Sequence, residues 1–354
     1  MSEERSVLHV LPHPGGGGET YVDLLSEMDG YRFDRVYLAT SPSPRGAWRQ
    51  LAVGVARAHR AAWSHDIVHV HGEVASLLML PALAARPSVV TTHGLHLLRR
   101  AAGVWATPAR ASLNATTGAA SATICTSRVE RDEIDKLVGA RARRRLRVIH
   151  NGVESGPRVE PDARVAFRAA LDLNGADVVG AWIAGLDEHK DPVTAARAAL
   201  AADDPRIVLL IVGDGPLRDA ADELARHSGG RVRVLGFRND VSTILGSADF
   251  FVASSVREGL SFSLLEAMSA RLAIVASQTP GNVEAVGDVG VLVPVGDVGA
   301  FSKAYARMAA DDRDRAALGD AARARVEEHF DITEMIRRTE AVYAEVVQTK
   351  RDGG

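Results

Sequence analysis

The stretch Asp249-Phe-Phe-Val-Ala-Ser-Ser-Val-Arg-Glu258-Gly-Leu-Ser-Phe-Ser-Leu-Leu-Glu266-Ala-Met268 begins apolar, passes a glycine, and continues rich in Leu, Ala and Met. Such an order predicts a strand, a loop and a helix. Ligands of an open α/β sheet bind outside the carboxyl ends of its strands, so we expect Glu258 at the mouth of a ligand site. Glu266 is expected on the helix.

The start of this predicted helix has two interpretations. The backbone N–H groups of Gly259, Leu260, Ser261, Phe262 and Ser263 are the donors of a helix amino end, which suits a phosphate or a sugar hydroxyl. Alternatively, the spacing from Ser263 to Glu266 fits a capping box, in which Glu266 only closes the helix start. The spacing is compatible with both roles of Glu266.

Strand-like and helix-like segments alternate along the whole chain. Strands are predicted at 7–11, 35–38, 66–71, 88–93, 122–127, 146–151, 178–185, 206–213, 232–236, 249–255, 272–277 and 290–294. Strands that alternate with helices indicate βαβ units and parallel sheets. We therefore predict an α/β protein of two Rossmann-like, doubly wound domains.

The predicted boundary between these domains lies between 151 and 161, where Gly, Pro and Glu break the periodicity. We assign 1–155 to the first domain and 156–332 to the second. The segment 334–348 has apolar residues at helical spacing, namely Ile336, Val342, Tyr343 and Val346. It predicts a last helix with one apolar face.

The composition and charge of the chain argue against several classes of protein. A chain of 354 residues can hold two cores, and a net charge of -3 with 25% charged residues is that of an ordinary globular protein. A pI near 6.5 argues against a nucleic-acid partner. The single Cys125 cannot form an intrachain disulfide. With a polar start and no apolar run long enough to span a bilayer, a cytoplasmic location is expected.

One short segment is strongly basic, although the net charge of the chain is small. Arg141, Arg143, Arg144 and Arg145 follow one another closely before a predicted strand. Such a run is either a solvated loop or a patch that contacts anionic lipid head groups. The second reading predicts peripheral contact with the inner face of a membrane.

Two loops of the first half have residues suited to ligands. Gly15 to Gly18 lie between the first predicted strand and a helix-like segment, where glycines let the backbone approach a phosphate. The Gly-X-Gly-X-X-Gly pattern fails at Thr20, so dinucleotide binding is not indicated, and a flexible loop without function is the alternative. His93 ends an apolar run and is expected to face a ligand.

The pair His69 and His71 raises the question of a metal. Residues two apart share one face of a strand. No carboxylate or cysteine cluster completes a ligand set around them in the sequence, so ordinary hydrogen-bonded histidines are predicted rather than zinc.

Lys190 is one of four lysines in the chain and follows the first strand of the second half. A compact ammonium at that point suits a diphosphate and would lie on the same side as Glu258. A solvated loop lysine is the alternative.

Taken in order, these segments resemble glycosyltransferase family 4, the retaining nucleotide-sugar enzymes of the GT-B fold. The resemblance covers nearly the whole chain. Its motifs are the loop 15–18, Asp66-Ile-Val-His-Val-His71, Thr92-His93-Gly94, Val148-Ile-His-Asn-Gly-Val153, 186–190, Val212-Gly-Asp-Gly-Pro216, Leu235-Gly-Phe237, 258–268 and Gly290-Val-Leu-Val-Pro294. It implies two Rossmann-like domains that face each other across a cleft, with a last helix, 333–354, crossing back to an acceptor-binding first domain.

The resemblance also implies roles for single residues. Glu258 would contact hydroxyls of the donor sugar, Glu266 would hold the ribose, and Lys190 would neutralise the leaving group. The remaining implied contacts are amides after Glu258 together with Gly16 and Gly17 for the diphosphate, Phe237 and Arg238 for the base, and His93 beside the donor sugar.

One position departs from the family pattern. Gly185 stands where the family commonly has an arginine. A guanidinium grips phosphate bidentately, so its loss would weaken donor binding or transfer the task to Arg257 or Arg238.

The implied reaction is sugar transfer with retention to an unidentified acceptor hydroxyl, with no cofactor and no metal. The Asp-X-Asp sequence Asp312-Arg-Asp314 lies in a charged helix-like stretch rather than at a strand end. Two alternatives stay open: a sugar-nucleotide 2-epimerase of the same architecture, and a nucleotide-sugar-binding protein without catalysis, which the glycine at 185 motivates. The acceptor loops around 40–44 and 95–108 carry no chemical signature.

Overall fold

The computed structural model describes residues 4–40, 48–95, 98, 105–154, 156 and 160–352. Much of the expected acceptor loops lies outside the described residues. The chain divides into two compact units, one of Met1–Asn151 with Ile332–Gly354 and one of Gly152–Asp331.

The N-terminal unit is built on a parallel six-stranded sheet with strand order β2-β1-β3-β4-β5-β6. Its strands are β1 (Arg5–Leu11), β2 (Tyr31–Tyr37), β3 (Ile67–His71), β4 (Ser88–Thr91), β5 (Ala122–Cys125) and β6 (Leu146–Val148). Its helices are α1 (Gly17–Leu25), α2 (Trp48–Ala62), α3 (Glu73–Leu78), α4 (Leu80–Ala85), α6 (Ala106–Ala119), α7 (Arg128–Asp135), α8 (Ala140–Arg143) and α17 (Ile332–Asp352).

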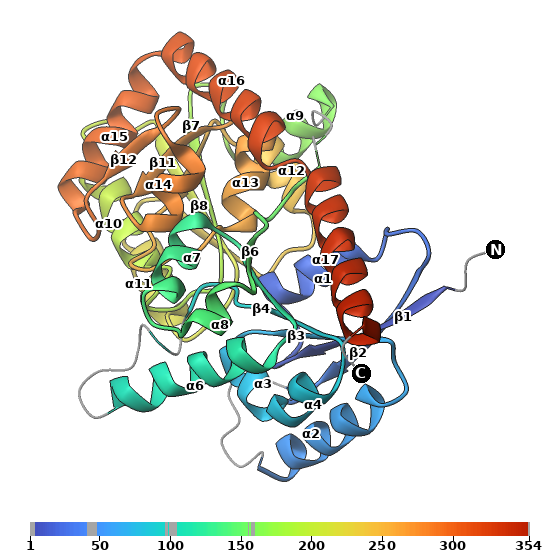
Figure 1. Cartoon of the computed structure of the whole chain (residues 1–354). Coiled ribbons are helices and arrows are strands. Elements are labelled where there is room, and N and C mark those ends of the chain that lie inside the picture. Colours follow the sequence, from blue (N-terminus) through green and yellow to red (C-terminus); the bar gives the residue numbers. More distant parts are fainter. Residues whose placement is uncertain are drawn as a thin grey trace. The chain divides into compact units, whose positions relative to one another are not determined.

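Alternation along β1 and β3 decides what covers each face of this sheet. Leu8, Val10, Val68 and Val70 point to one face and pack in a core with α2, α3 and α4. The intervening histidines of the same strands point to the other face, which α1 and α17 cover (Figure 1). One face of the sheet is thus aliphatic, and the other carries the imidazoles.

The last helix is longer than the predicted segment. It packs on the imidazole-bearing face, where Tyr343 contacts His69 and Thr339 contacts Tyr21. Its buried stripe runs through Met335, Thr339, Val342, Tyr343 and Val346. Ile336, which the sequence placed in the apolar stripe, is only half-buried, because Met335 takes the inward position.

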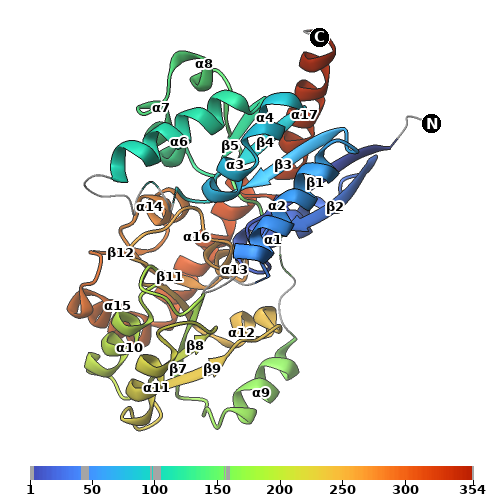
Figure 2. The same ribbon diagram turned by 90° about the horizontal axis from the view of Figure 1, so that it is seen from below.

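The C-terminal unit repeats the architecture with strand order β12-β11-β10-β7-β8-β9, again parallel (Figure 2). Its strands are β7 (Val178–Ile183), β8 (Ile207–Val212), β9 (Val232–Gly236), β10 (Phe250–Ala253), β11 (Ala273–Ser277) and β12 (Val291–Val293). Its helices are α9 (Pro161–Ala170), α10 (Pro192–Ala201), α11 (Arg218–Arg226), α12 (Val241–Ser247), α13 (Phe262–Ser269), α14 (Pro280–Val286), α15 (Val298–Ala310) and α16 (Asp312–His329).

All twelve predicted strands are present, most of them shorter than predicted, and the predicted parallel α/β class is confirmed. The predicted strand ends that proved to be loops, such as 184–185 and 254–255, are the segments that carry the candidate site.

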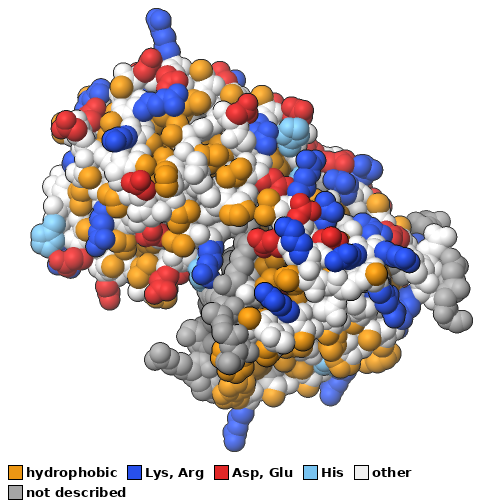
Figure 3. Space-filling view, turned by 60° about the vertical axis from the view of Figure 1, so that its left-hand side comes forward, with side chains coloured by type: hydrophobic (Ala, Val, Ile, Leu, Met, Phe, Trp, Pro, Cys, Tyr) orange, Lys and Arg blue, Asp and Glu red, His pale blue; other side chains and the backbone are white. Residues whose placement is uncertain are grey.

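No helix among the described residues is long and apolar enough to cross a membrane. Acidic and basic side chains are interspersed over the face drawn in Figure 3, in keeping with the small net charge of -3.

Candidate functional site

The C-terminal unit brings two of the predicted residues together. Lys190 follows β7 and Glu258 follows β10, and these strands are neighbours in the sheet. Lys190 Nζ lies 2.5 Å from Glu258 Oε2, and the Ser255 hydroxyl donates to the same oxygen at 3.0 Å. Glu258 is 7% exposed, whereas a quarter of the Lys190 side chain meets solvent. The ion pair is therefore charge-assisted, with its carboxylate shielded and its ammonium accessible.

Hydrogen bonds between the two loops hold this pair in place. The backbone N–H of Val256 donates to the carbonyl of His189 at 2.8 Å. The hydroxyl of Ser254 donates to the Lys190 carbonyl at 3.0 Å and accepts from Trp182 Nε1 at 2.9 Å. Sequence reasoning missed Ser254 and Trp182, because a serine at a strand end and an apolar tryptophan within a strand carry no signal of this role.

Glycines allow the loops to touch through their backbones. A Cβ on Gly281, in α14, would lie 1.8 Å from the carbonyl oxygen of Gly259. A Cβ on Gly213 would lie 1.9 Å from the carbonyl oxygen of Ala184. Any side chain at either glycine would push these loops apart. From the sequence, Gly213 belongs to a motif of the family resemblance, whereas Gly281 was overlooked.

The capping-box interpretation of Glu266 is wrong. Helix α13 begins at Phe262 with Ser261 as its N-cap, so Ser263 lies inside the first turn and Glu266 inside the second. The N-cap makes no side-chain hydrogen bond to the helix, and the hydroxyls of Ser261 and Ser263 lie 3.1 Å apart. Burial raises the pKa of the Glu266 carboxyl above its usual value. The amino end of α13 thus has no side-chain cap.

The remaining predicted residues of this unit differ in how free they are to bind. A Cβ on Gly185 would meet only the Asp214 carbonyl oxygen, at 3.9 Å, so the position has room for a side chain. Phe237 is 74% exposed. Arg238 binds Asp240 through two hydrogen bonds of 2.8 and 2.6 Å, which raise the pKa of the guanidinium. Arg238 is therefore already paired, which argues against its replacing the missing arginine.

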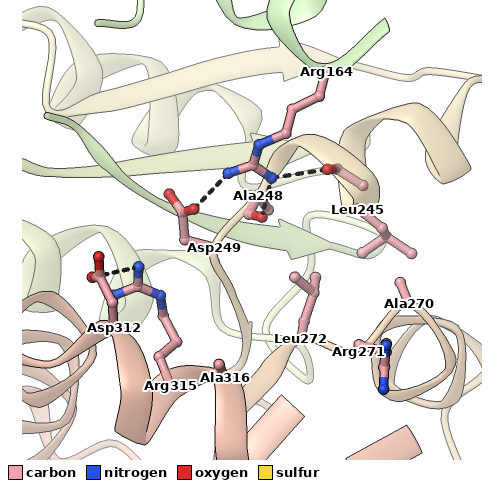
Figure 4. A pocket seen from close by; sticks show the side chains of 11 residues that line it. Arg164, Leu245, Ala248, Asp249, Ala270, Arg271, Leu272, Asp312, Arg315 and Ala316 are labelled. Atoms are coloured by element: carbon pink, nitrogen blue, oxygen red, sulfur yellow. Dashed lines mark hydrogen bonds and ion pairs between the residues drawn. The ribbon is translucent and has the colours of Figure 1, made fainter. Parts of the chain in front are cut away.

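A cavity of about 250 Å³ in the same unit lies elsewhere (Figure 4). Its lining includes Asp249, at the amino end of β10 and thus opposite Glu258 along the strand. Arg164 pairs with Asp249 at 2.7 Å, and Arg315 pairs with Asp312 at 2.8 Å. These charges neutralise one another at the strand end where α/β proteins do not bind ligands, so we do not assign the cavity to the site.

In the N-terminal unit the glycine loop leads directly into a helix. Gly15 and Gly16 have φ of 84° and 81°, and Gly16 is the N-cap of α1. No atom of the residues that the structure describes lies within 4 Å of a Cβ built on either glycine. The carboxylate of Glu19 accepts the N–H of Gly15 at 2.5 Å, and a hydrogen bond from Tyr37 lowers its pKa. Gly16 and Gly17 thus lie at a helix amino end that Glu19 already partly satisfies.

The histidines of this unit form a buried cluster. The rings of His69 and His71 lie 4.2 Å apart, as their shared strand face predicts, and His9 of β1 lies 5.1 Å from both. Both nitrogens of His69 are bonded, Nδ1 to the Tyr343 hydroxyl and Nε2 to the Thr91 hydroxyl, each at 2.7 Å. The prediction of hydrogen-bonded histidines is confirmed.

Ligand atoms of His9, His69 and His71 all lie within 4.8 Å of one another, which is the spacing a metal site requires. However, two of these rings already bond to each other, and His69 has no unbonded nitrogen. Burial lowers the pKa of all three imidazoles well below the usual value. The cluster is therefore a neutral hydrogen-bonded network, and its geometry does not favour a metal.

His93 lies at the edge of this network. Its Nε2 is 3.0 Å from His71 Nδ1, and its ring meets the edge of Tyr21 at 5.2 Å. A Cβ on Gly18 would lie 3.9 Å from the His93 ring, so the structure brings His93 beside the start of α1. His93 is half-buried, unlike the other members of the network.

A buried carboxylate that sequence reasoning missed holds the His93 turn. His93, Gly94 and Leu95 all have positive φ, of 50°, 110° and 47°. Glu130 of α7 accepts the N–H groups of Gly94 and Thr126, each at 2.7 Å. Burial raises the Glu130 pKa, and these hydrogen bonds oppose the shift. A glutamate in the Arg128–Asp135 segment, which is rich in charge, offered no signal of this contact.

Comparison with known proteins gives two family matches. The model described as Glycosyltransferase Family 4 matches residues 7–156, and the model described as Glycosyl transferases group 1 matches residues 178–311. The putative glycosyltransferase EpsD of Bacillus subtilis is 28% identical over 68% of this chain and 66% of EpsD. The UDP-Gal:alpha-D-GlcNAc-diphosphoundecaprenol alpha-1,3-galactosyltransferase of Escherichia coli is 29% identical over 51% of this chain and 49% of that protein. The chain thus spans about half to two thirds of the length of these relatives.

Solved structures resemble the whole chain more fully. HepE of Anabaena, solved in complex with UDP-glucose, has a TM-score of 0.82 at 19% identity and covers 98% of this chain and 100% of its own. WaaG, a glycosyltransferase involved in lipopolysaccharide biosynthesis, has a TM-score of 0.74 at 14% identity, covering 95% and 99%. At these identities the similarity establishes the fold.

Proposed function

The chain belongs to the group 1 and family 4 glycosyltransferases and has the GT-B fold, and on that premise we propose that it is a retaining hexosyltransferase. It moves a sugar from a nucleoside-diphosphate sugar to an acceptor hydroxyl without a metal. The observation that carries the proposal is the ion pair of Lys190 with Glu258 at the carboxyl ends of two neighbouring strands. The family models that match are those of glycosyltransferases, which gives the 2-epimerase interpretation no support.

The chemistry needs positive charge where the diphosphate leaves. Negative charge accumulates on the departing phosphate, and preorganised donors that face it lower the barrier. We assign this task to Lys190 and to the backbone N–H groups of Gly259 to Ser263 at the uncapped start of α13. Glu258 binds donor-sugar hydroxyls, and Glu266 binds the ribose. In the N-terminal unit, Gly16 and Gly17 contact the diphosphate and His93 the sugar. The base contacts are assigned to Phe237 and Arg238.

The Lys190–Glu258 pair suggests how the donor enters. Without a ligand the two charges neutralise each other, and a diphosphate would compete with Glu258 for the partly exposed ammonium. Binding then exchanges one charge-assisted partner for another and frees the carboxylate to accept sugar hydroxyls. In this proposal, the ion pair is the form of the site without a ligand. Substitution of Glu258 should therefore change diphosphate affinity and turnover in different ways.

The proposal is tested first with the wild-type chain and defined probes. UDP, GDP and ADP are screened by thermal shift, because a ligand that binds the folded state raises the apparent melting temperature. The corresponding glucose and mannose nucleotides are then assayed for release of the free diphosphate with and without glycan or polyprenol-linked acceptors. Binding together with acceptor-dependent release supports transfer. Conversion of the donor alone would support an epimerase, and absence of any binding would contradict the proposal.

Gly185 separates a transferase from a binding protein. A Cβ at this position would make only an ordinary contact with the Asp214 carbonyl oxygen, at 3.9 Å, so the backbone tolerates a substitution here. The guanidinium of an arginine would add a second cation for phosphate. If the chain is a transferase with a weakened phosphate clamp, Gly185→Arg tightens donor binding and raises kcat/KM. Tight donor binding with no turnover in either form would favour a non-catalytic nucleotide-sugar-binding protein.

We also propose peripheral contact with anionic lipid through the basic run. Two of its members are tied to the protein: Arg145 donates to the carbonyls of Gly118 and Ala120, and Arg143 to that of Asp135. Arg141 and Arg144 are exposed and are the members we assign to lipid. Each arginine near an anionic surface contributes about 1 kcal/mol. Substituting both with glutamine should therefore weaken sedimentation with phosphatidylserine vesicles at low salt, and unchanged sedimentation would contradict the contact.

A further inference from the structure

A chain of hydrogen bonds crosses the sheet of the N-terminal unit from β1 to the end of β4. His9 Nδ1 lies 2.9 Å from His71 Nε2, and His71 Nδ1 lies 3.0 Å from His93 Nε2. His9 lies in β1, His71 is the last residue of β3, and His93 follows β4. These three strands are neighbours in the sheet, in that order. The chain begins fully buried at His9 and ends at the half-buried His93.

Neutral imidazoles impose a single rule on such a chain. A neutral ring carries one N–H, so each nitrogen-to-nitrogen contact needs a donor on one side and a lone pair on the other. If His71 donates to His93, then His9 must donate to His71, and all three rings are protonated at Nδ1. If His93 donates to His71, all three are protonated at Nε2. Because His71 contacts both neighbours, the rings cannot choose their tautomers independently.

The buried end of the chain decides between the two arrangements. His9 Nε2 is buried and has no hydrogen-bond partner among the residues that the structure describes. Protonation at Nε2 would leave an N–H without an acceptor in the interior, and orphaned buried N–H groups are rarer than orphaned acceptors. Protonation at Nδ1 leaves only a lone pair at that position. The Nδ1 arrangement therefore costs less.

We propose that His9 and His71 are positioning residues that fix His93 as its Nδ1–H tautomer, with Nε2 engaged as an acceptor. The single N–H of His93 is then at Nδ1, and an N–H donor is the type of group that binds a hydroxyl oxygen of a sugar. The proposal deepens the role assigned above to His93 and rests on it. The lowered pKa values of His9 and His71, caused by burial, agree with neutral rings at these two positions.

The test reads the tautomers directly. Long-range ¹H–¹⁵N correlation spectra of histidine-labelled wild-type protein distinguish Nδ1–H from Nε2–H rings. Wild type should show His9, His71 and His93 as Nδ1–H. Finding His93 as Nε2–H would overturn the proposal without any variant.

Two substitutions at His9 provide the matched comparison. His9→Phe keeps the volume and removes the donor, so His93 should populate both tautomers. His9→Asn restores an N–H two bonds from Cβ, where Nδ1 stands, and should restore the single tautomer. His59 lies on α2 and does not belong to this series of hydrogen-bonded histidines, so His59→Gln should leave the His93 signals unchanged. Retention of a pure Nδ1–H ring at His93 in His9→Phe would overturn the proposal.

Activity distinguishes this inference from the proposed function. Outer groups that orient an active residue typically change activity about 10- to 100-fold, and we expect a fall in kcat of about tenfold in His9→Phe, with UDP affinity unchanged. Rescue of kcat in His9→Asn would support positioning. We call the hydrogen-bonded series His9, His71 and His93 the relay. If the His93 ring changes tautomer while kcat stays constant, the relay exists but His93 has no role in transfer.

Discussion

The two units hold their candidate residues in opposite ways. In the C-terminal unit, Lys190 and Glu258 are charged and stand on loops that touch through backbone atoms. In the N-terminal unit, His9 and His71 are neutral and lie on the strands themselves. A charged pair on loops can exchange partners with an anionic ligand, whereas a buried neutral chain can only pass on the position of a proton. The difference is consistent with our proposal that one unit binds the leaving group and the other orients a single donor.

The largest expected effect is on turnover when Glu258 becomes glutamine. The change removes the charge to which we assign the donor hydroxyls, and loss of one preorganised group commonly costs about 10²- to 10³-fold in kcat. It also releases Lys190, so UDP or GDP should bind as tightly as before or more tightly. Steady-state kinetics and calorimetry measure the two quantities separately.

The control for this substitution is Glu223→Gln, an exposed glutamate of α11 paired with Arg226. It should leave both quantities unchanged. Wild-type turnover in Glu258→Gln would show that the ion pair is only structural. The contrast between a charged binding pair in one unit and neutral histidines in the other would then not hold.

Next in size is the effect of Gly281→Ala on stability. The added Cβ would stand 1.8 Å from the Gly259 carbonyl oxygen, and forcing backbone apart in a packed region costs about 1–3 kcal/mol. Urea unfolding should show this loss. Gly175→Ala, where a Cβ meets nothing within 4 Å, should stay near wild type. Equal stability of the two variants would mean that the loops are not held by backbone contact.

An effect of comparable size is expected from Glu130→Gln in the N-terminal unit. The carboxylate accepts two backbone N–H groups, and an amide can present its oxygen to only one of them. Leaving the other donor unsatisfied costs about 1–3 kcal/mol, and the His93 turn should loosen. Unfolding in urea and the His93 signals in NMR report the two consequences. An unchanged turn would show that positive φ at these positions needs no support from Glu130.

The last effect is the contribution of the buried histidines to the dependence of stability on pH. Burial lowers the pKa of His9, His69 and His71 in the folded state, so below about pH 6.5 the unfolded chain binds more protons than the folded one. Their contribution is complete above that pH and is lost as pH falls toward the lowered values. His71→Phe should flatten the slope between pH 6.5 and 5. A slope that stays as steep as in wild type would indicate that His71 is charged in the folded protein.

Much of the fold could be predicted because it rests on local patterns. The twelve strands follow from apolar runs. Lys190, Glu258 and His93 could be proposed because each is an ionisable residue that ends or follows a predicted strand, on the side where α/β sheets bind ligands. Residues that act through distant contacts gave no such signal. Trp182 reads as core, Gly281 as a turn, and Glu130 as one charge among many in α7, and only the tertiary contacts reveal what each one holds. The capping box at Ser263 failed because the helix has its N-cap at Ser261, two residues earlier, which places Glu266 in the second turn.

The same limit applies to the histidines. The strand pattern placed His69 and His71 on one face, but it could not show that His9 lies beside them or that His71 connects His9 to His93. The local sequence pattern of a strand does not determine which strands are its neighbours in the sheet. The relay therefore appeared only when β1, β3 and β4 were seen as neighbours.

Calorimetric titration of the tightest-binding nucleoside diphosphate, UDP or GDP, into wild type, Lys190→Ala and His71→Phe tests the division of tasks most directly. Removing a charge-assisted bond to phosphate costs about 1.5–3 kcal/mol, so Lys190→Ala should weaken affinity roughly 10- to 100-fold. His71→Phe should match wild type within about twofold, because the relay orients a sugar contact and not a phosphate contact. Unchanged affinity in Lys190→Ala, or an equal loss in both variants, would contradict the account.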